Sequence, residues 1–294
     1  MYDTNGKTEL SILTFSKERP LQLEGLLTSL ESNLTGDWKV ELVINAPNEA
    51  FKSAYKKVLK VHSQRIGSMV FEESAKEFQA ATSRLLRQNR SPFVTFFVDD
   101  NLLIERLDVS DLTRLSRAGS FTTLRLGKNI TRSMFSDVST DQPALEDFES
   151  NNHTGSNAVF QWKFGDGGKN WRYLALEGLV LRRDQARKLL PLVRCPNPNL
   201  LEDKLNKPRF KSQFEQGIVF AKSKLLNLPV NRVQESRKNP VNSHEASTEY
   251  LLSLFERGFR LDASRYFGIN NEILHADLPL ELINPAGQVW PDTH

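Results

Sequence analysis

Residues 92–101 read PFVTFFVDDN, a nearly continuous apolar run with an abrupt acidic end. Such a run is typical of a β-strand whose two faces are both covered by helices, as in a parallel sheet. In open α/β sheets, ligands bind beyond the carboxyl ends of the strands. The run therefore predicts a central strand over residues 92–98, with Asp99, Asp100 and Asn101 placed where a ligand binds.

Upstream of this strand, short β-rich runs alternate with amphipathic segments, which is the pattern of a parallel sheet wrapped by helices. The predicted strands cover residues 9–15, 40–44 and 68–72. We expect one helix to be capped by Ser16 and entered through Pro20, and another over 51–59. A third is expected to follow the capping-box pair Ser74 and Glu77.

Downstream the pattern loosens, and residues 127–156 are a polar stretch that we expect to form a loop. The predicted strands cover 120–126, 157–164, 173–181 and 217–221, and the predicted helices cover 184–193, 199–206 and 245–257. No linker divides the chain, so we expect one α/β domain over residues 1–294. It would consist of a mostly parallel sheet sandwiched by helices and continuous with a smaller mixed sheet.

The composition excludes several classes of protein. The formal net charge is +3, and its 39 basic and 36 acidic residues are interspersed, which argues against a nucleic-acid partner. Cys195 is the single cysteine, so no intrachain disulfide forms. There is no apolar run of membrane-spanning length and no secretion signal, which predicts a cytoplasmic protein. Motifs of P-loop kinases, dinucleotide-binding dehydrogenases, serine hydrolases and zincins are absent.

The acidic strand end has a specific chemical interpretation. Asp99 and Asp100 are adjacent, so their side chains point in different directions. One can accept a hydrogen bond from a ribose or base while the other binds Mg²⁺ or Mn²⁺. That cation would stabilise the charge on a departing nucleoside diphosphate. The alternative is a solvated turn that only ends the strand.

Three stretches resemble glycosyltransferase family 2 and its GT-A relatives: LSILTFSKERPLQLEGLLTSL (10–30), VELVINAPNE (40–49) and SPFVTFFVDDNLLIERL (91–107). The resemblance implies a GT-A fold with a nucleotide-sugar-binding half at 8–107 and an acceptor-binding half with a C-terminal extension at 108–294. It also implies transfer of a sugar from a UDP-, GDP- or dTDP-linked donor to a hydroxyl of a carbohydrate acceptor. The reaction would be inverting and metal-dependent, as in polysaccharide biosynthesis.

The same resemblance assigns residues to the donor site. Thr14 and Phe15 would touch the nucleobase, and Arg19 would lie beside the site. Asn45 stands where the family usually has an aspartate that binds the base or ribose. Asp99 would contact the nucleotide, and Asp100 the metal.

An inverting transfer also needs a carboxylate to take the proton of the acceptor hydroxyl. The pair Glu202–Asp203, in PNPNLLEDKL, resembles the acidic pair near the family's acceptor site, and Asp203 is the first choice. Two acids at a helix start also suit the helix dipole, without catalysis. Glu177, an acid on an apolar run, is the rival candidate. Its alternative role is an ion pair with Arg182 or Arg183.

Other residues are weaker candidates. Arg125 could pair with a phosphate, and His275 or His244 could contact a metal or diphosphate late in the chain. Aromatic residues that could stack on sugars, but that also suit a core, are Trp162, Trp171 and Tyr173. A basic cluster that could hold an anionic acceptor comprises Lys204, Lys207, Arg209 and Lys211.

Two other functions remain open from the sequence. A sugar-1-phosphate nucleotidyltransferase would use a similar sheet, although the Gly-rich loop and Lys that those enzymes place after the first strand are absent here. A GT-A-like domain that binds a glycan or protein without catalysis would tolerate Asn45.

Overall fold

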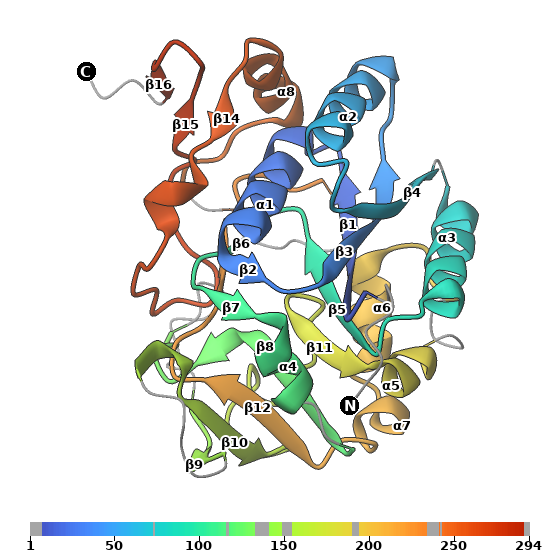
Figure 1. Ribbon diagram of the computed structural model, residues 1–294, viewed down its shortest axis with the longest axis vertical. Helices are drawn as coiled ribbons and strands as arrows, with labels where there is room; N and C mark the ends of the chain where they lie inside the picture. Colours follow the sequence, from blue (N-terminus) through green and yellow to red (C-terminus); the bar gives the residue numbers. More distant parts are fainter. Residues whose placement is uncertain are drawn as a thin grey trace.

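A nine-stranded mixed sheet forms the centre of the molecule (Figure 1). The computed structural model describes residues 8–72, 74–115, 118–132, 141–148, 155–189, 194–233, 241 and 243–290. The strand order is β4-β3-β1-β5-β11-β8-β12-β10-β9. The first four strands are parallel, namely β1 (Leu10–Lys17), β3 (Trp38–Asn45), β4 (Ile66–Glu72) and β5 (Phe93–Val98). This parallel core is as predicted.

The second half of the sheet is mixed. Its strands are β8 (Ser120–Gly127), β9 (Glu146–Asp147), β10 (Val159–Lys163), β11 (Leu179–Arg182) and β12 (Gln216–Phe220). Strand β11 runs antiparallel to both β5 and β8, and so joins the two halves, while β12 is parallel to β8. The predicted fold class, an α/β protein whose parallel sheet continues into a mixed sheet, is therefore confirmed.

Short strands pair outside the main sheet. They are β2 (Leu34–Thr35) with β7 (Leu107–Asp108), β6 (Asn101–Leu103) with β13 (Leu225–Asn227), and β14 (Arg260–Leu261), β15 (Leu282–Ile283) and β16 (Val289–Trp290) together. Two 3₁₀ turns, η1 (Gly155–Asn157) and η2 (Ala263–Tyr266), complete these connections. The β6–β13 pair matters most, because β6 begins directly after Asp100.

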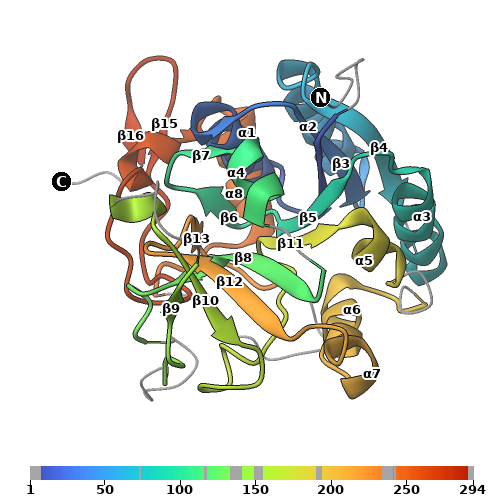
Figure 2. The same cartoon turned by 60° about the horizontal axis from the view of Figure 1, so that its bottom comes forward.

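Helices cover both faces of the sheet. The helices α1 (Pro20–Asn33), α2 (Glu49–Val61) and α8 (Thr248–Glu256) contact one another over one face. On the other side Figure 2 shows α3 (Ala75–Gln88), α5 (Arg183–Arg187), α6 (Pro198–Leu205) and α7 (Pro208–Lys211), and α4 (Val109–Leu115) follows β7. Successive residues of β1 serve the two cores, since Ile12 packs in the first and Leu13 in the second. No helix among the described residues has the length and apolar composition of a membrane span.

The helix starts differ from the predictions in two places. Ser16 does not cap α1, which begins at Pro20 behind Arg19, because the Ser16 hydroxyl is used elsewhere. Helix α8 begins at Thr248, later than predicted, because the Ser247 side chain accepts from Tyr250 N. The Ser74 cap of α3 forms as predicted, with Ser74 Oγ accepting from Glu77 N.

The strand predicted over 173–181 is wrong in its first part, since β11 begins only at Leu179. Gly178 is the cause: it has a φ of +69°, which breaks the extended conformation, and its N–H donates to Phe96 O. Within the predicted loop at 127–156 the structure contains β9, and residues 133–140 and 149–154 lie outside the described part. Helix α5 ends at Arg187, and the rest of the helix predicted to 193 falls partly outside the described residues.

Gly178 is the position at which backbone freedom matters most for the site, because it orients Glu177. A Cβ added there would lie 2.8 Å from Leu124 Cβ and against Leu225 Cδ1. We expect Gly178→Ala to lower the free energy of unfolding by about 2–5 kcal/mol, the sum of about 1–2 kcal/mol for a left-handed residue with a Cβ and about 1–3 kcal/mol for overpacking. Urea unfolding measures this change.

The control is Gly268→Ala. Gly268 has a similar φ of +72°, but an added Cβ would meet nothing within 4 Å. It should therefore lose only the backbone contribution, about 1–2 kcal/mol. Equal losses in the two variants would contradict the packing argument.

Candidate functional site

Polar residues meet at the carboxyl edge of the parallel strands. Lys17 ends β1 opposite Asn45 at the end of β3, and Asn45 stands opposite Glu72 at the end of β4. Asn45 Nδ2 donates to Glu72 O at 3.1 Å. Asp99 and Asp100 follow β5 at this same edge. The topology therefore brings the predicted donor-side residues Asn45, Asp99 and Asp100 to one border of the sheet, where α/β proteins bind ligands.

The Asp-Asp-Asn sequence makes a tight turn between β5 and β6. Asn101 is fully buried, and its Oδ1 accepts from Val98 N at 3.1 Å. This side-chain bond closes the turn, as Asn commonly does. Asn101 thus has a local structural role, and the turn presents the two carboxylates.

Arg19 lies between these two carboxylates. Its Nη1 is 2.9 Å from Asp99 Oδ1 and 2.9 Å from Asp100 Oδ2. The rest of the guanidinium binds Asn231, with Nε 2.6 Å from Oδ1 and Nη2 2.5 Å from the backbone O. Burial lowers the pKa of Arg19, but Asp99 and Asp100 outweigh it, so the net shift is upward and the guanidinium stays charged.

The remaining oxygens of the acidic pair also have donors. Asp99 Oδ2 accepts from Ser16 Oγ at 2.8 Å and from Lys17 N at 3.0 Å. Asp100 Oδ1 accepts from Asn227 Nδ2 at 2.7 Å. Each of the four carboxylate oxygens therefore accepts at least one hydrogen bond from the protein.

The turn from β1 into α1 holds Arg19 in this position. Glu18 has a φ of +55°, a left-handed conformation that is uncommon outside glycine. Arg19 N donates to Tyr55 Oη at 2.9 Å, and Tyr55 Oη is 2.7 Å from Ser16 Oγ. Because Ser16 donates its one proton to Asp99, Tyr55 must be the donor to Ser16. A buried chain therefore runs from α2 through the turn to Asp99.

These contacts test the predicted metal site. A divalent cation takes carboxylate oxygens as ligands, and here both carboxylates already bind the Arg19 guanidinium. The third expected ligand, His275, lies against Glu177 instead. The described residues contain no group of three or more His, Cys, Asp or Glu side chains arranged to hold a metal. In this arrangement Asp99, Asp100 and His275 do not fit the predicted cation.

A second charged cluster lies on the mixed-sheet side. Glu177 Oε2 accepts from Arg125 Nη1 at 3.1 Å, and Glu177 Oε1 is 3.6 Å from His275 Nε2. Burial alone would raise the pKa of Glu177, but His275 and Arg125 lower it to about 2. Glu177 is therefore an ionised carboxylate at neutral pH. It pairs with Arg125 rather than with Arg182 or Arg183, the partners considered from the sequence.

Glu202 on α6 joins this cluster, but its pKa is shifted in the direction opposite to that of Glu177. Its Oε1 accepts from Leu176 N at 2.9 Å and its Oε2 from Tyr173 Oη at 3.1 Å. Burial and the charge of Glu177 raise the pKa of Glu202 to about 7. Two nearby carboxylates whose environments drive their pKa values apart are a common arrangement for acid–base chemistry.

Asp100 connects the two clusters. Burial raises the pKa of Asp100, Arg19 opposes this rise, and the charges of Asp99 and Glu177 add to it, so that the pKa is about 6. The attraction of His275 lowers the pKa of Asp100 in part. The acidic strand end and the Glu177 cluster thus form one electrostatic unit across the junction of β5 and β11.

Several predicted residues lie elsewhere. Thr14 is fully buried within β1, and Phe15, opposite Val98, packs against Phe78 with ring centroids 5.4 Å apart, so both side chains are buried rather than exposed at the ligand edge. Asp203 is partly exposed on α6, next to Glu202 in the chain. His244 is exposed. Hydrogen bonds from Ser243 and the attraction of His244 lower the pKa of Asp277.

The aromatic candidates divide between the core and the site, and two of the basic candidates bind backbone carbonyls. Trp162 and Trp171 are core residues in a T-shaped pair 5.2 Å apart, whereas Tyr173 reaches Glu202. In the basic cluster, Lys204 donates to Arg194 O and Lys211 to Arg172 O. The thiol of Cys195 is buried, and burial raises its pKa to about 11, which leaves it protonated.

The sequence did not reveal Asn227 and Asn231, which reach the acidic pair and Arg19. Asn227 pairs with Asn101 in the β13–β6 ladder, which carries its side chain to Asp100. The only local signal was two asparagines in the apolar run LLNLPVN at 225–231. Tyr55 was likewise missed, because it reads as one more apolar position of α2.

Comparisons with known proteins add the following. No family model matches the sequence. No curated protein matches it. Among solved structures, the chain is similar to the mannosyltransferase PcManGT from Pyrobaculum calidifontis in complex with GDP-Man and Mn²⁺, at 14% identity and a TM-score of 0.34, over 43% of this chain and 41% of that one. It is also similar to S. aureus TarS 1–349 in complex with UDP, at 11% identity and a TM-score of 0.47, over 74% and 59%.

A nucleotidyl transferase from Methanothermobacter is similar at 10% identity and a TM-score of 0.40, over 73% of this chain and 88% of that one. The similarity spans less than two thirds of both glycosyltransferase chains. The structural neighbours thus include glycosyltransferases of GT-A type, but at these scores the likeness carries no assignment of activity. The fold rests on the strand order, and any function has to be argued from the site.

The Tyr55 hydroxyl is a testable part of this site. Tyr55→Phe leaves Arg19 N without its acceptor and Ser16 without its donor, so we expect the free energy of unfolding to fall by about 1–3 kcal/mol. Tyr250→Phe is the control, because Tyr250 is exposed and accepts only from Trp290 Nε1. It should change stability by less than about 0.5 kcal/mol. Urea unfolding of both variants compares them, and similar losses would contradict the role of the buried chain.

The raised pKa of Glu202 predicts a pH-dependent stability. The folded protein holds the Glu202 proton more tightly than the unfolded chain, so this stabilisation is complete below pH 4.5 and is lost as pH rises through about 7. Glu202→Gln stays neutral and avoids the loss. Relative to wild type it should gain about 2–3 kcal/mol between pH 5 and pH 8. Urea unfolding at both values measures this gain.

The control variant is Glu49→Gln, whose side chain is 82% exposed, so burial does not favour its neutral form. It should show no such gain. A Glu202→Gln variant that keeps the same difference from wild type at both pH values would contradict the assignment.

Proposed function

We propose that this protein is a glycosyltransferase that moves a sugar from a nucleoside diphosphate donor to a hydroxyl of a carbohydrate acceptor, with inversion at the anomeric carbon. One observation carries the proposal. Strand β11 pairs with β5 and Gly178 N donates to Phe96 O, so Glu177 is held near the strand end that carries Asp99 and Asp100, while Glu202 accepts from Leu176 N in the same stretch. Residues 8–107 would bind the nucleotide, and residues 108–294 the acceptor.

The donor would lie along the edge formed by the ends of β3, β1 and β5. Asn45 offers an amide and Lys17 a cation, whose side chain is 46% exposed. The exposed Arg232 follows Asn231 in the segment that faces Arg19. Side chains of these types suit the base, ribose and phosphates of a nucleoside diphosphate. Because Asp99, Asp100 and His275 do not fit a cation as arranged, no step of this mechanism uses Mn²⁺ or Mg²⁺.

Glu202 is our candidate for the general base, ahead of its neighbour Asp203. Its pKa near 7 lets the carboxylate take a proton at neutral pH. The acceptor oxygen would lose its proton to Glu202 and form a bond to the anomeric carbon. The bond from that carbon to the diphosphate would break, and its electron pair would leave with the diphosphate oxygen. Glu177, held ionised, would stabilise the positive charge that develops on the sugar.

The test is release of nucleoside diphosphate from a panel of UDP-, GDP- and dTDP-linked sugars, with and without oligosaccharide acceptors. Wild type should be active, with a rate that rises between pH 6 and pH 8 as Glu202 loses its proton. Glu202→Gln should lower kcat by about 10²–10⁴-fold, which is the usual contribution of a general base. Circular dichroism would establish that the variant is folded.

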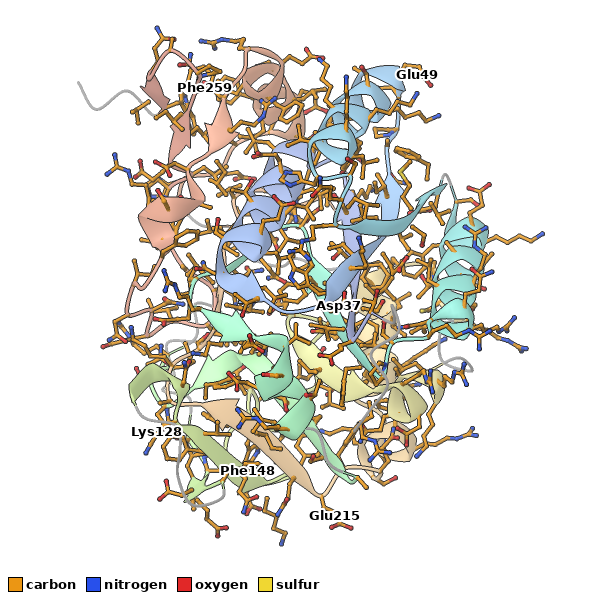
Figure 3. All side chains as sticks on the ribbon, viewed as in Figure 1. Asp37, Glu49, Lys128, Phe148, Glu215 and Phe259 are labelled. Carbon is orange, nitrogen blue, oxygen red and sulfur yellow. The ribbon has the colours of Figure 1, made fainter. Side chains whose placement is uncertain are left out.

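Glu215→Gln is the matched control, because Glu215 is exposed at the lower end of the molecule in Figure 3 and should leave the rate unchanged. A larger loss in Asp203→Asn than in Glu202→Gln would move the base to Asp203. Release of pyrophosphate from a nucleoside triphosphate and a sugar 1-phosphate would establish a nucleotidyltransferase instead. Binding of glycans without any turnover would leave a non-catalytic domain.

A further inference from the structure

The guanidinium of Arg19 stands between Asp99 and Asp100, where a cation bound to the nucleotide would be expected. What this means for donor binding rests on the proposed function. We propose that the Arg19 guanidinium takes the place of a divalent cation between Asp99 and Asp100, so that the protein binds its nucleoside diphosphate without a metal. Binding of the nucleotide without a metal departs from the metal dependence that the sequence resemblance implied.

Geometry supports the substitution. The guanidinium bridges one oxygen of each carboxylate at 2.9 Å, as a bound cation would bridge them. The other oxygen of Asp99 accepts from Ser16 and Lys17, and the other oxygen of Asp100 accepts from Asn227. A cation placed between these carboxylates would have to displace Arg19 or lie against its like charge.

The energetics favour Arg19 remaining in place. It is 8% exposed, and four of its five N–H donors are directed at Asp99, Asp100 and Asn231. Moving it would break all four bonds and leave a buried charge uncompensated, which is strongly destabilising. The Glu18 turn and the Tyr55 hydroxyl fix the backbone from which the side chain extends. Arginine is permanently charged and has a planar fork that suits paired carboxylates.

The phosphates would then be met by the protein's own cations. Lys17 and Arg232 are exposed basic residues near Arg19, the first just before it in the chain and the second next to Asn231 in the facing segment. Lys17 Nζ lies 3.5 Å from Glu18 Oε1 and donates to Val233 O at 2.9 Å. That contact fastens the 228–233 segment over the end of β1. These two side chains would supply the positive charge that a metal provides in other enzymes of this kind.

Electron paramagnetic resonance of Mn²⁺ tests the inference without relying on activity. Wild type should leave Mn²⁺ free in solution, whereas Arg19→Met, which removes the charge but keeps a long side chain, should bind one Mn²⁺. The double variant R19M/D100N should lose that site again. Arg114→Met is the control, because Arg114 forms an exposed ion pair with Asp111, and it should behave as wild type.

If Arg19→Met does not fold, nucleotide binding by the wild-type protein tests whether a metal is needed. Calorimetric titration with UDP and GDP should give dissociation constants that agree within about twofold in EDTA and in Mn²⁺, because a bridging metal would change them by about tenfold or more. One Mn²⁺ bound by wild type and lost in Asp100→Asn would overturn the inference. A folded Arg19→Met that binds no Mn²⁺ would also overturn it.

The two proposals fail in different ways. If no nucleoside diphosphate binds under any condition, the proposed function fails, while the Mn²⁺ measurements still decide whether Arg19 holds the cation position. If nucleotide binds only with Mn²⁺, the inference fails, and the glycosyltransferase proposal stands.

Discussion

The buried ion cluster of Arg19 with Asp99 and Asp100 is the interaction on which the site depends. Two adjacent carboxylates at the end of an apolar strand repel each other and lose hydration when they are buried, so they need a fixed counter-charge. Arg19 supplies it from the turn after β1, and Asn227 at the end of β13 and Asn231 in the segment that follows complete it. Three distant parts of the chain are therefore held together at one edge of the sheet.

This arrangement explains why the β1–α1 turn is unusual. Glu18 adopts a left-handed conformation that costs free energy in a residue with a side chain. In return the turn directs the Lys17 N–H and the Arg19 side chain to the same carboxylate. Ser16 is drawn into the same network, which is why it does not cap the helix. The hydrogen bond of Ser16 to the buried Asp99 therefore outweighs the local preference of serine for a helix N-cap.

The charged layer continues past the acidic pair into the mixed half of the sheet. Because β11 runs antiparallel between β5 and β8, the turn at Gly178 places Glu177 close to Asp100 and to Arg125 on β8. Glu202 approaches from α6 and shares this environment without a cation of its own. The contrast between a strongly ionised Glu177 and a Glu202 that titrates near neutrality arises from which partners each one has. Arg125 and His275 contact the first, while Tyr173 and a backbone amide contact the second.

The sequence by itself determined the parallel core and its ligand edge. Apolar runs with turn residues between them predict β1, β3 and β5, whose local pattern and burial agree, and also β4, which is partly exposed. It also pointed to Asp99, Asp100 and Arg125 at strand ends and to Glu177 in an apolar run, where a charge is costly without a partner. Arg19, Glu202 and His275 were candidates through the family resemblance. Only the tertiary structure decided which of these meet. The bridging of both aspartates by Arg19, the orientation of Glu202 toward the cluster and the contributions of Asn227, Asn231 and Tyr55 all come from residues 26 to 212 positions apart in the chain. Contacts between such distant residues depend on strand pairing and helix packing, which have no local signature in the sequence.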